Sequence, residues 1–278
     1  MRGLRYAAFT FVDRIVALDA GVSAVGMFHV PAHIDAFPSS LLAEATGQLA
    51  AWVAVAKLGF RVRPVAGIAH ETEYAGVPRP GDTLHTEIRI DSCEEDAVAY
   101  QGSASIDGKR VLDLRNCVGP MLPLEEFDDE AAMREFFATL CGSGAALDRF
   151  PGVTLVPLQL IEREKGRFAR ARLNVPTDAA FFADHFPRRP VFPGTLLLDR
   201  MTTLAAELVR ERVPQSRPFA RLVTDVKLRA FTEPGSTLEL FATLDDGDAN
   251  TIDATLEARA DGQRRPVGRA RVRFEVTR

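Results

Sequence analysis

The feature that most constrains this chain is an internal repeat, because a duplicated sequence predicts two copies of one structural unit. The segment PSSLLAE at 38–44 matches PGTLLLD at 193–199 in its proline, its paired leucines and its final carboxylate, at an offset of 155 positions. A second pair, PGDTL at 80–84 and PGSTL at 234–238, follows at an offset of 154 positions. The two pairs occur in the same order in each half, as a duplication requires.

A third match supports the duplication and helps to place its boundary. Each half opens with a similar run, FVDRI at 11–15 and LIER at 160–163. A chain of 278 residues is long enough for two units of ordinary size. Acidic and then apolar residues at 124–140 predict a connecting helix before a Gly-Ser-Gly loop. We therefore expect an N-terminal unit over 1–141 and a C-terminal unit over 150–278.

Each half contains a long apolar segment without internal proline, at 41–58 and at 196–213. Both segments begin just after a proline, which the first turn of a helix tolerates because its N–H groups have no intrahelical acceptor. Apolar side chains at helical spacing predict that one face of each helix packs in a core. These residues are Leu42, Ala45, Leu49 and Trp52, then Leu197, Met201, Leu204 and Leu208.

Beyond each helix the pattern changes to the alternation that predicts strands, at 85–90, 238–241 and 267–276. Asp-Gly pairs, which favour tight turns, occur at 107–108, 246–247 and 261–262. Each half then reads as short strands, one long helix and several antiparallel strands. We expect an α+β fold in which a helix lies on one face of each sheet.

Composition excludes several functional classes. A formal net charge of −4 argues against a nucleic-acid-binding protein. The three cysteines, Cys93, Cys117 and Cys141, are widely spaced and form no metal-binding motif, so we expect no metal site and no cofactor. An odd, sparse count fits a reducing compartment. The sequence has neither a signal-peptide pattern nor an apolar run of about 18 residues, which predicts a soluble cytoplasmic protein outside the membrane.

The segment DHFPRRPVFPG at 184–194 carries residues suited to chemistry. His185 has the side chain most easily poised for proton transfer near neutral pH. Gly194 begins a predicted helix, where unpaired N–H groups and the helix dipole would stabilise an oxygen that gains negative charge. Asp199 follows in that helix, and a carboxyl group facing an apolar interior is expected to hold a proton. A base, an acid and an oxyanion donor together suit the elimination of water from a 3-hydroxyacyl thioester.

The same segment closely resembles a known family signature. The pattern is His-Phe-Pro-x-x-Pro-Val-x-Pro-Gly-x-Leu-x-x-Asp at 185–199, in which the carboxylate follows 14 positions after the histidine. It resembles that of the bacterial 3-hydroxyacyl-[acyl-carrier-protein] dehydratases, which have the hotdog fold. The segment 38–48 is similar to the helix portion of that signature, and 11–15 is similar to the family's opening strand. The resemblance therefore implies a double hotdog, with two long central helices each wrapped by an antiparallel sheet.

The chain departs from the family pattern at two glycine positions and in its first half. Arg188 stands where the family has a glycine, and Ser39 stands where the first helix would start with glycine. The first half also has no His-Phe-Pro. His29, followed by Val and Pro, is one candidate for the missing histidine, and His33 is an alternative. These departures predict that the N-terminal unit is partly degenerate.

In the family, the histidine and the carboxylate of one site come from opposite hotdogs. The resemblance thus implies that His185 pairs with Glu44 as base and acid, with Gly194 as oxyanion donor. A second site would pair His29 with Asp199. We expect one competent site, at His185 and Glu44. Substrate contacts implied by the motif involve Phe186, Pro193, Gly194 and Arg188.

The function that follows is a hydro-lyase of fatty acid biosynthesis, which converts a 3-hydroxyacyl thioester of acyl carrier protein or coenzyme A to its 2-enoyl product. Arg188 is expected either to contact the carrier's phosphate or to be an ordinary solvated arginine. Two alternatives stay open: a hotdog thioesterase, which would release free thiol, and a non-catalytic acyl-binding or carrier-binding module. A double hotdog buries its own pairing interface, so a monomer is feasible and a homodimer is also open.

Overall fold

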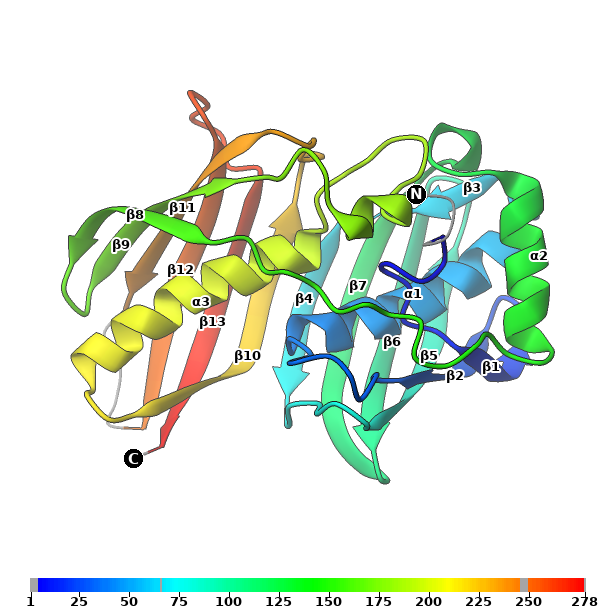
Figure 1. Cartoon of the computed structure of the whole chain (residues 1–278), viewed down its shortest axis with the longest axis horizontal. Helices are drawn as coiled ribbons and strands as arrows, with labels where there is room; N and C mark the ends of the chain where they lie inside the picture. The colour runs from blue at the N-terminus through cyan, green and yellow to red at the C-terminus, as the bar shows by residue number, and fades with distance from the viewer. Residues whose placement is uncertain (1–4, 66, 246–249, 278) are drawn as a thin grey trace.

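An antiparallel sheet runs through the whole molecule (Figure 1). The computed structural model describes residues 5–65, 67–245 and 250–277. The strands are β1 (Arg14–Asp19), β2 (Ser23–His29), β3 (Val62–Pro64), β4 (Ile68–Tyr74), β5 (Thr83–Cys93), β6 (Ala97–Ile106), β7 (Lys109–Pro123), β8 (Leu158–Glu164), β9 (Phe168–Asn174), β10 (Arg217–Leu228), β11 (Thr237–Leu244), β12 (Thr251–Ala260) and β13 (Gly268–Thr277).

The order of the strands repeats on the two sides of the sheet. The halves join where β4 pairs antiparallel with β10, with Val223 opposite Thr72. Outward from that junction the order is β4, β7, β6, β5, β2, β1 on one side and β10, β13, β12, β11, β9, β8 on the other. Each side thus places at the junction the first strand of this path that follows its long helix, and then its last strand, while β3 pairs with β7 off the path. This repetition is what the sequence repeat predicts.

Two long helices lie against the two parts of the sheet. The helix α1 (Ser40–Lys57) packs on β2, β5, β6 and β7, whereas α3 (Gly194–Arg212) packs on β9 to β13. The two helices contact each other near the β4–β10 junction (Figure 1). All eight apolar side chains that the helical spacing assigns to the core are buried. Burial of these side chains is the main favourable term that holds each helix to its sheet.

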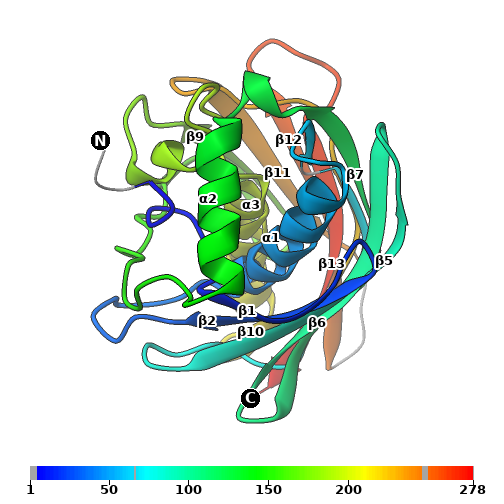
Figure 2. The ribbon, with the colours of Figure 1, turned by 90° about the vertical axis from the view of Figure 1, so that its right-hand side faces the viewer.

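The predicted connecting helix is shorter than expected. Residues 124–126 form a 3-10 turn, η1 (Leu124–Glu126), and the helix α2 (Glu130–Cys141) begins only at Glu130. The cause is local, because the Asp129 carboxylate accepts a hydrogen bond from the N–H of Ala132 and so caps the helix. Figure 2 shows α1 between α2 and the curved sheet, and the Trp52 ring of α1 stacks on Phe137 of α2.

The predicted strands and turns agree with the structure where it describes them. The segments 85–90, 238–241 and 267–276 lie within or one residue beyond β5, β11 and β13. Asp107 and Gly108 join β6 to β7 with positive φ at both positions, and 261–262 follows β12. The Asp-Gly pair at 246–247 lies outside the described residues.

Two general properties follow from the described residues. Among the helices of these residues, none is long and apolar enough to cross a membrane. In the same part of the chain, no group of three or more His, Cys, Asp or Glu side chains gathers as a metal site would require.

Candidate active site

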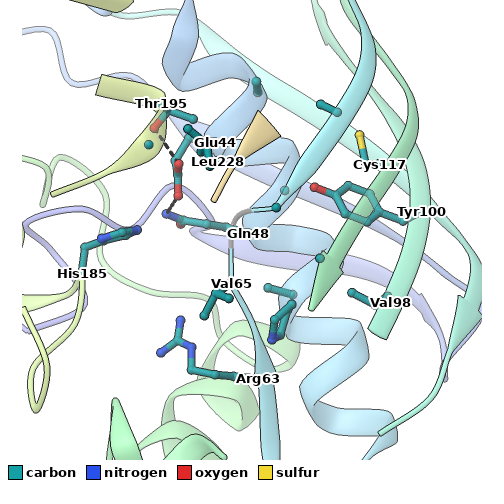
Figure 3. A pocket seen from close by; sticks show the side chains of 18 of the residues that line it. Glu44, Gln48, Arg63, Val65, Val98, Tyr100, Cys117, His185, Thr195 and Leu228 are labelled. Carbon is teal, nitrogen blue, oxygen red and sulfur yellow. Dashed lines mark hydrogen bonds between the residues drawn. The ribbon is translucent and has the colours of Figure 1, made fainter. Parts of the chain in front are cut away.

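A cavity of about 220 Å³ lies between α1, the start of α3 and the strands β4, β6 and β7, and we call it the first cavity. One end is polar and holds His185, Glu44 and Gly194, three of the residues predicted from the sequence. Apolar side chains line much of the remainder, including Ala51, Val55, Val98, Leu114 and Val226. Figure 3 shows His185 and Glu44 at one end of the cavity and Tyr100 with Cys117 at the other. The cavity therefore offers a reactive end and an apolar chamber that suits an acyl chain.

His185 is held in one orientation by its own loop. It follows the 3-10 turn η2 (Ala180–Ala183), and its backbone N–H donates to the carbonyl of Phe181 at 2.9 Å. The imidazole Nδ1 lies 2.8 Å from the carbonyl oxygen of Val191. Because a carbonyl only accepts, Nδ1 must carry the proton, and the neutral ring leaves the lone pair of Nε2 available. This is the tautomer that a general base requires.

The electrostatic surroundings favour the neutral imidazole. Burial lowers the pKa of His185, and the nearby Arg63 guanidinium lowers that pKa further. The Glu44 carboxylate acts in the opposite direction, as does the bond to Val191. Burial is the largest of these effects, so the net direction is downward. His185 is accordingly unprotonated, and able to accept a proton, at neutral pH.

Glu44 is fixed by hydrogen bonds from two helices. It lies in the second turn of α1, and its Oε2 accepts from the Thr195 hydroxyl of α3 at 2.7 Å. Its Oε1 accepts from the Gln48 side-chain amide at 2.9 Å. That amide is itself anchored, because it also donates to the carbonyl of Phe9 and accepts from the N–H of Phe11. Figure 3 shows Glu44 held between Thr195 and Gln48, on the same side of the cavity as His185.

The start of α3 supplies the unpaired backbone donors of the site. Gly194 and Thr195 are its first residues, and their N–H groups have no acceptor within the helix. A Cβ atom at Gly194 would lie 2.2 Å from Cδ1 of Leu228. A residue with a Cβ atom here would have to displace the Leu228 side chain, so glycine allows the start of α3 to pack closely on β10. Pro193 precedes the helix and its carbonyl accepts from the N–H groups of Leu196 and Leu197.

Several residues that sequence reasoning missed also shape the polar end. The Asp184 carboxylate accepts from the N–H groups of Tyr6 and Phe9, and so ties the N-terminal segment to the histidine loop. Burial raises the pKa of Asp184. The Arg63 guanidinium lies 4.0 Å from the Phe186 ring centroid. Burial lowers the pKa of Arg63 to about 10, although a 3.7 Å ion pair to Asp128 opposes this. No local pattern marks these contacts, since each joins segments far apart in the chain.

The far end of the first cavity carries two titratable side chains, Cys117 and Tyr100, within its apolar lining. Burial raises the pKa of the Cys117 thiol to about 11. Burial also raises the pKa of Tyr100, whose side chain faces Cys117. Both groups therefore stay protonated at neutral pH, and a protonated thiol is a poor nucleophile.

The second predicted pair is not brought together. The Nδ1 of His29 lies 3.3 Å from the Thr83 hydroxyl, and its Nε2 lies 3.6 Å from the Asp148 carboxylate. Asp199 is bound instead by Arg200, whose Nε and Nη2 lie 3.0 and 2.5 Å from Oδ2. His29 lines neither the first cavity nor the separate cavity that Asp199 lines. In the sequence, Pro31 lies seven positions before Pro38, whereas Pro187 lies six positions before Pro193, and this extra residue is consistent with the displacement of His29.

The two remaining motif residues differ in where they lie. Phe186 lines the first cavity and packs edge-on against Phe127, with ring centroids 5.2 Å apart. Arg188 does not line that cavity, because its guanidinium donates to the carbonyl of Glu125 and to the Asp129 carboxylate, each at 3.0 Å. The arginine that replaces the family glycine therefore leaves the cavity open.

Comparison with solved structures identifies the class of fold. The 12:0-ACP thioesterase from Umbellularia californica aligns over 92% of this chain and 94% of its own, with a TM-score of 0.57 at 10% identity. An acyl-ACP thioesterase from Bacteroides thetaiotaomicron aligns over 91% and 98%, with a TM-score of 0.54 at 14% identity. At such low identity the likeness concerns the fold alone, and it is that of hotdog-type thioesterases.

Sequence comparison identifies the family. A family model described as ApeI-like, ApeI dehydratase, matches residues 161–263. The 3-hydroxyacyl-[acyl-carrier-protein] dehydratase FabZ of Rickettsia bellii (strain OSU 85-389) is 31% identical over 108 residues, which are 38% of this chain and 74% of that protein. FabZ of Latilactobacillus sakei subsp. sakei (strain 23K) is 39% identical over 95 residues, which are 32% of this chain and 68% of that protein. The chain belongs to the FabZ-like dehydratase family.

Proposed function

We propose that this protein is a double hotdog enzyme that removes water from a 3-hydroxyacyl thioester to form the 2-enoyl product. The observation that carries the proposal is the convergence of His185, Glu44 and the start of α3 on one cavity. Residues 1–141 form one hotdog, which supplies Glu44, and residues 150–278 form the other, which supplies His185. The repeated strand order supports this division, with α1 and α3 as the central helices.

The reaction uses a base and an acid on opposite sides of the substrate. The Nε2 of His185 removes a proton from Cα, and the electrons of that C–H bond form the Cα=Cβ double bond. The Cβ–O bond breaks, and the hydroxyl leaves as water with a proton from Glu44. A thioester carbonyl placed at the start of α3 accepts from the Gly194 N–H while it carries negative charge. One such donor is typically worth about 2.7–4 kcal/mol in the transition state.

Thr195 allows Glu44 to work in both protonation states. A hydroxyl is both donor and acceptor, so the Thr195 oxygen that donates to the ionised Glu44 can accept from the protonated one. Gln48 keeps the carboxyl plane in position throughout, because its amide is anchored on Phe9 and Phe11. After each turnover the proton on His185 and the proton lost by Glu44 are restored by exchange with solvent.

The substrate is an acyl thioester of acyl carrier protein or coenzyme A, and the reaction belongs to fatty acid biosynthesis in the cytoplasm. The names of the relatives, which refer to acyl-carrier-protein substrates, support this class. Phe186, Pro193 and Gly194 contact the reacting end of the acyl group. The half-exposed Arg188 contacts the carrier's phosphate by exchanging its ion pair with Asp129. One chain holds a complete site, and a homodimer is compatible with it.

The test is a paired assay on crotonyl and longer 2-enoyl and 3-hydroxyacyl thioesters. Enoyl absorbance follows dehydration and hydration, and a thiol reagent follows hydrolysis. We expect absorbance changes without thiol release, and a fall of about 10²–10⁴-fold in rate for Glu44→Gln and His185→Ala. Glu207→Gln and His70→Ala, which change exposed residues on α3 and β4, serve as matched controls.

The assay separates the alternatives. Thiol release at the rate of acyl turnover would assign the protein to the thioesterases instead. Acyl binding without a change in enoyl absorbance and without thiol release would assign the protein to the non-catalytic binding modules. Full activity of Glu44→Gln would disprove the pairing of Glu44 with His185, and full activity of His185→Ala would disprove the dehydratase mechanism.

A further inference from the structure

A second cavity, of about 200 Å³, lies at the start of α1. Its polar lining consists of Ser39, Ser40, Asp199, Thr202 and Thr203. Its apolar lining includes Ala206, Pro218, Phe219, Val223 and Phe274. Tyr74 and Leu198 line both cavities, so these two side chains stand between them.

The second cavity is the counterpart of the first in the sequence repeat. At the offset of 155 positions, Ser39 corresponds to Gly194 and Ser40 corresponds to Thr195. Asp199 corresponds to Glu44 at the same offset. A helix start, a hydroxyl and a carboxylate therefore recur together. The N–H groups of Ser39 and Ser40, like those that begin α3, have no acceptor within their helix.

One hydrogen bond of the first cavity is absent from the second. Thr195 donates to Glu44 across the helix pair at 2.7 Å. The equivalent bond would join Ser40 to Asp199, but among the described residues the buried Ser40 hydroxyl has no hydrogen-bond partner, although the residue is only 7% exposed. Aspartate is one methylene shorter than glutamate, and Arg200 holds its carboxylate.

This unpaired hydroxyl points to a ligand. A buried polar group without a partner costs free energy, which a bound acceptor would recover. The acceptor that fits is an uncharged carbonyl oxygen, because Asp199 lines the same cavity and would repel a carboxylate. The Phe219, Val223 and Phe274 side chains provide an apolar surface for a chain attached to that carbonyl.

The second cavity lacks the group that would make it reactive. None of its lining residues is a histidine, and His29 lies elsewhere. A ligand held there has no imidazole to remove its Cα proton.

We propose that the second cavity is a non-catalytic binding site for an acyl group, whose thioester carbonyl accepts from the Ser40 hydroxyl and from the start of α1. The site holds an acyl chain of about the size that the first cavity accepts, since the two volumes are nearly equal. Binding here does not require that the first cavity catalyse dehydration.

The experiment is calorimetric titration of the full chain with N-(2-acetamidoethyl)octanamide, an unreactive amide analogue of an octanoyl thioester. We expect two equivalents per chain. Thr202→Phe, which fills the second cavity, should leave one equivalent. Ser40→Ala should keep two equivalents and weaken one of them about tenfold, which corresponds to loss of one hydrogen bond.

Controls separate this proposal from the proposed reaction. Glu207→Gln should bind two equivalents with unchanged affinities, and His185→Ala should lose activity while it retains the second equivalent. One equivalent in the wild-type chain would overturn the inference. So would two equivalents that neither Thr202→Phe nor Ser40→Ala alters. An inactive wild-type chain that still binds two equivalents would overturn the dehydratase proposal and leave the binding site standing.

Discussion

The Glu44 carboxyl group is held in place by hydrogen bonds from neighbouring side chains, and not by its own rotamer preference alone. Its two oxygens accept from Thr195 and Gln48, which lie on different helices, and Gln48 is anchored on the backbone of residues 9 and 11. A long, flexible carboxylate that is held at both oxygens loses little further freedom when a substrate binds. The position of the Glu44 carboxyl group therefore depends on the side chains of two other residues.

Gln48→Ala tests that positioning role. We expect kcat to fall about 10- to 100-fold with little change in KM, because the carboxyl group moves relative to the substrate without leaving the cavity. Steady-state kinetics of enoyl hydration measure both constants. Gln159→Ala, an exposed amide on β8, is the control. An unchanged kcat in Gln48→Ala would show that Glu44 needs no such support.

The pH dependence of the reaction reports on His185. Because burial holds the pKa of His185 below its ordinary value of about 6.5, the neutral base persists to lower pH and kcat/KM should fall only below that value. Arg63→Met removes a nearby positive charge, so the pKa of His185 should rise and the acid limb should move to higher pH. Arg63→Lys retains the charge, so the acid limb of the pH profile should move less. A limb that stays in place in Arg63→Met would contradict this origin of the shift.

At the scale of elements, the start of α3 has to meet two structural requirements at once. The helix must present free N–H groups to the first cavity, and it must pack closely on β10, where Leu228 approaches Gly194. Pro193 ends the preceding loop and allows the helix to begin there. The Pro-Gly pair of the motif thus has a role in packing as well as in the proposed chemistry.

Gly194→Ala should destabilise the protein, because its Cβ would lie 2.2 Å from Cδ1 of Leu228. Overpacking of this kind costs about 1–3 kcal/mol, which should lower the melting temperature by several degrees. Adding Leu228→Ala removes the obstructing atom, so the double variant should be more stable than the sum of the two single effects predicts. Thermal unfolding of the wild type, the two single variants and the double variant measures this coupling. Strictly additive changes in stability would refute it.

At the scale of the whole molecule, the antiparallel pairing of β4 with β10 joins the halves and brings α1 and α3 into contact. That contact is where Thr195 of one helix meets Glu44 of the other. The proposed site therefore needs both halves of one chain, in a fixed relative position, and needs no second chain.

Mixing experiments test that self-sufficiency. Glu44→Gln and His185→Ala each lack one of the two proposed groups, so an equimolar mixture should be as inactive as either protein alone. Enoyl hydration after prolonged co-incubation is the measurement, with wild type diluted into each variant as the reference. Recovery of activity in the mixture would mean that halves exchange between chains.

The amino-acid sequence by itself determined the features that depend on local pattern. Helical spacing predicted the buried faces of α1 and α3, and the side chains that it assigned to the core are buried. The division into two units stays a prediction, with which the repeated strand order agrees. The burial prediction succeeds because helical periodicity acts over a few residues. The connecting helix was predicted six residues too early, because the cap at Asp129 outweighs the helical pattern before it.

Only the tertiary structure decided which distant side chains meet. It placed Arg63 beside Phe186 and tied Asp184 to residues 6 and 9. In the structure, Asp199 binds the Arg200 guanidinium and His29 lies outside both cavities, although the family resemblance implied that His29 and Asp199 pair. The physical reason is that such contacts depend on side-chain length and on how helices and sheets pack, and one methylene or one inserted residue is enough to change them.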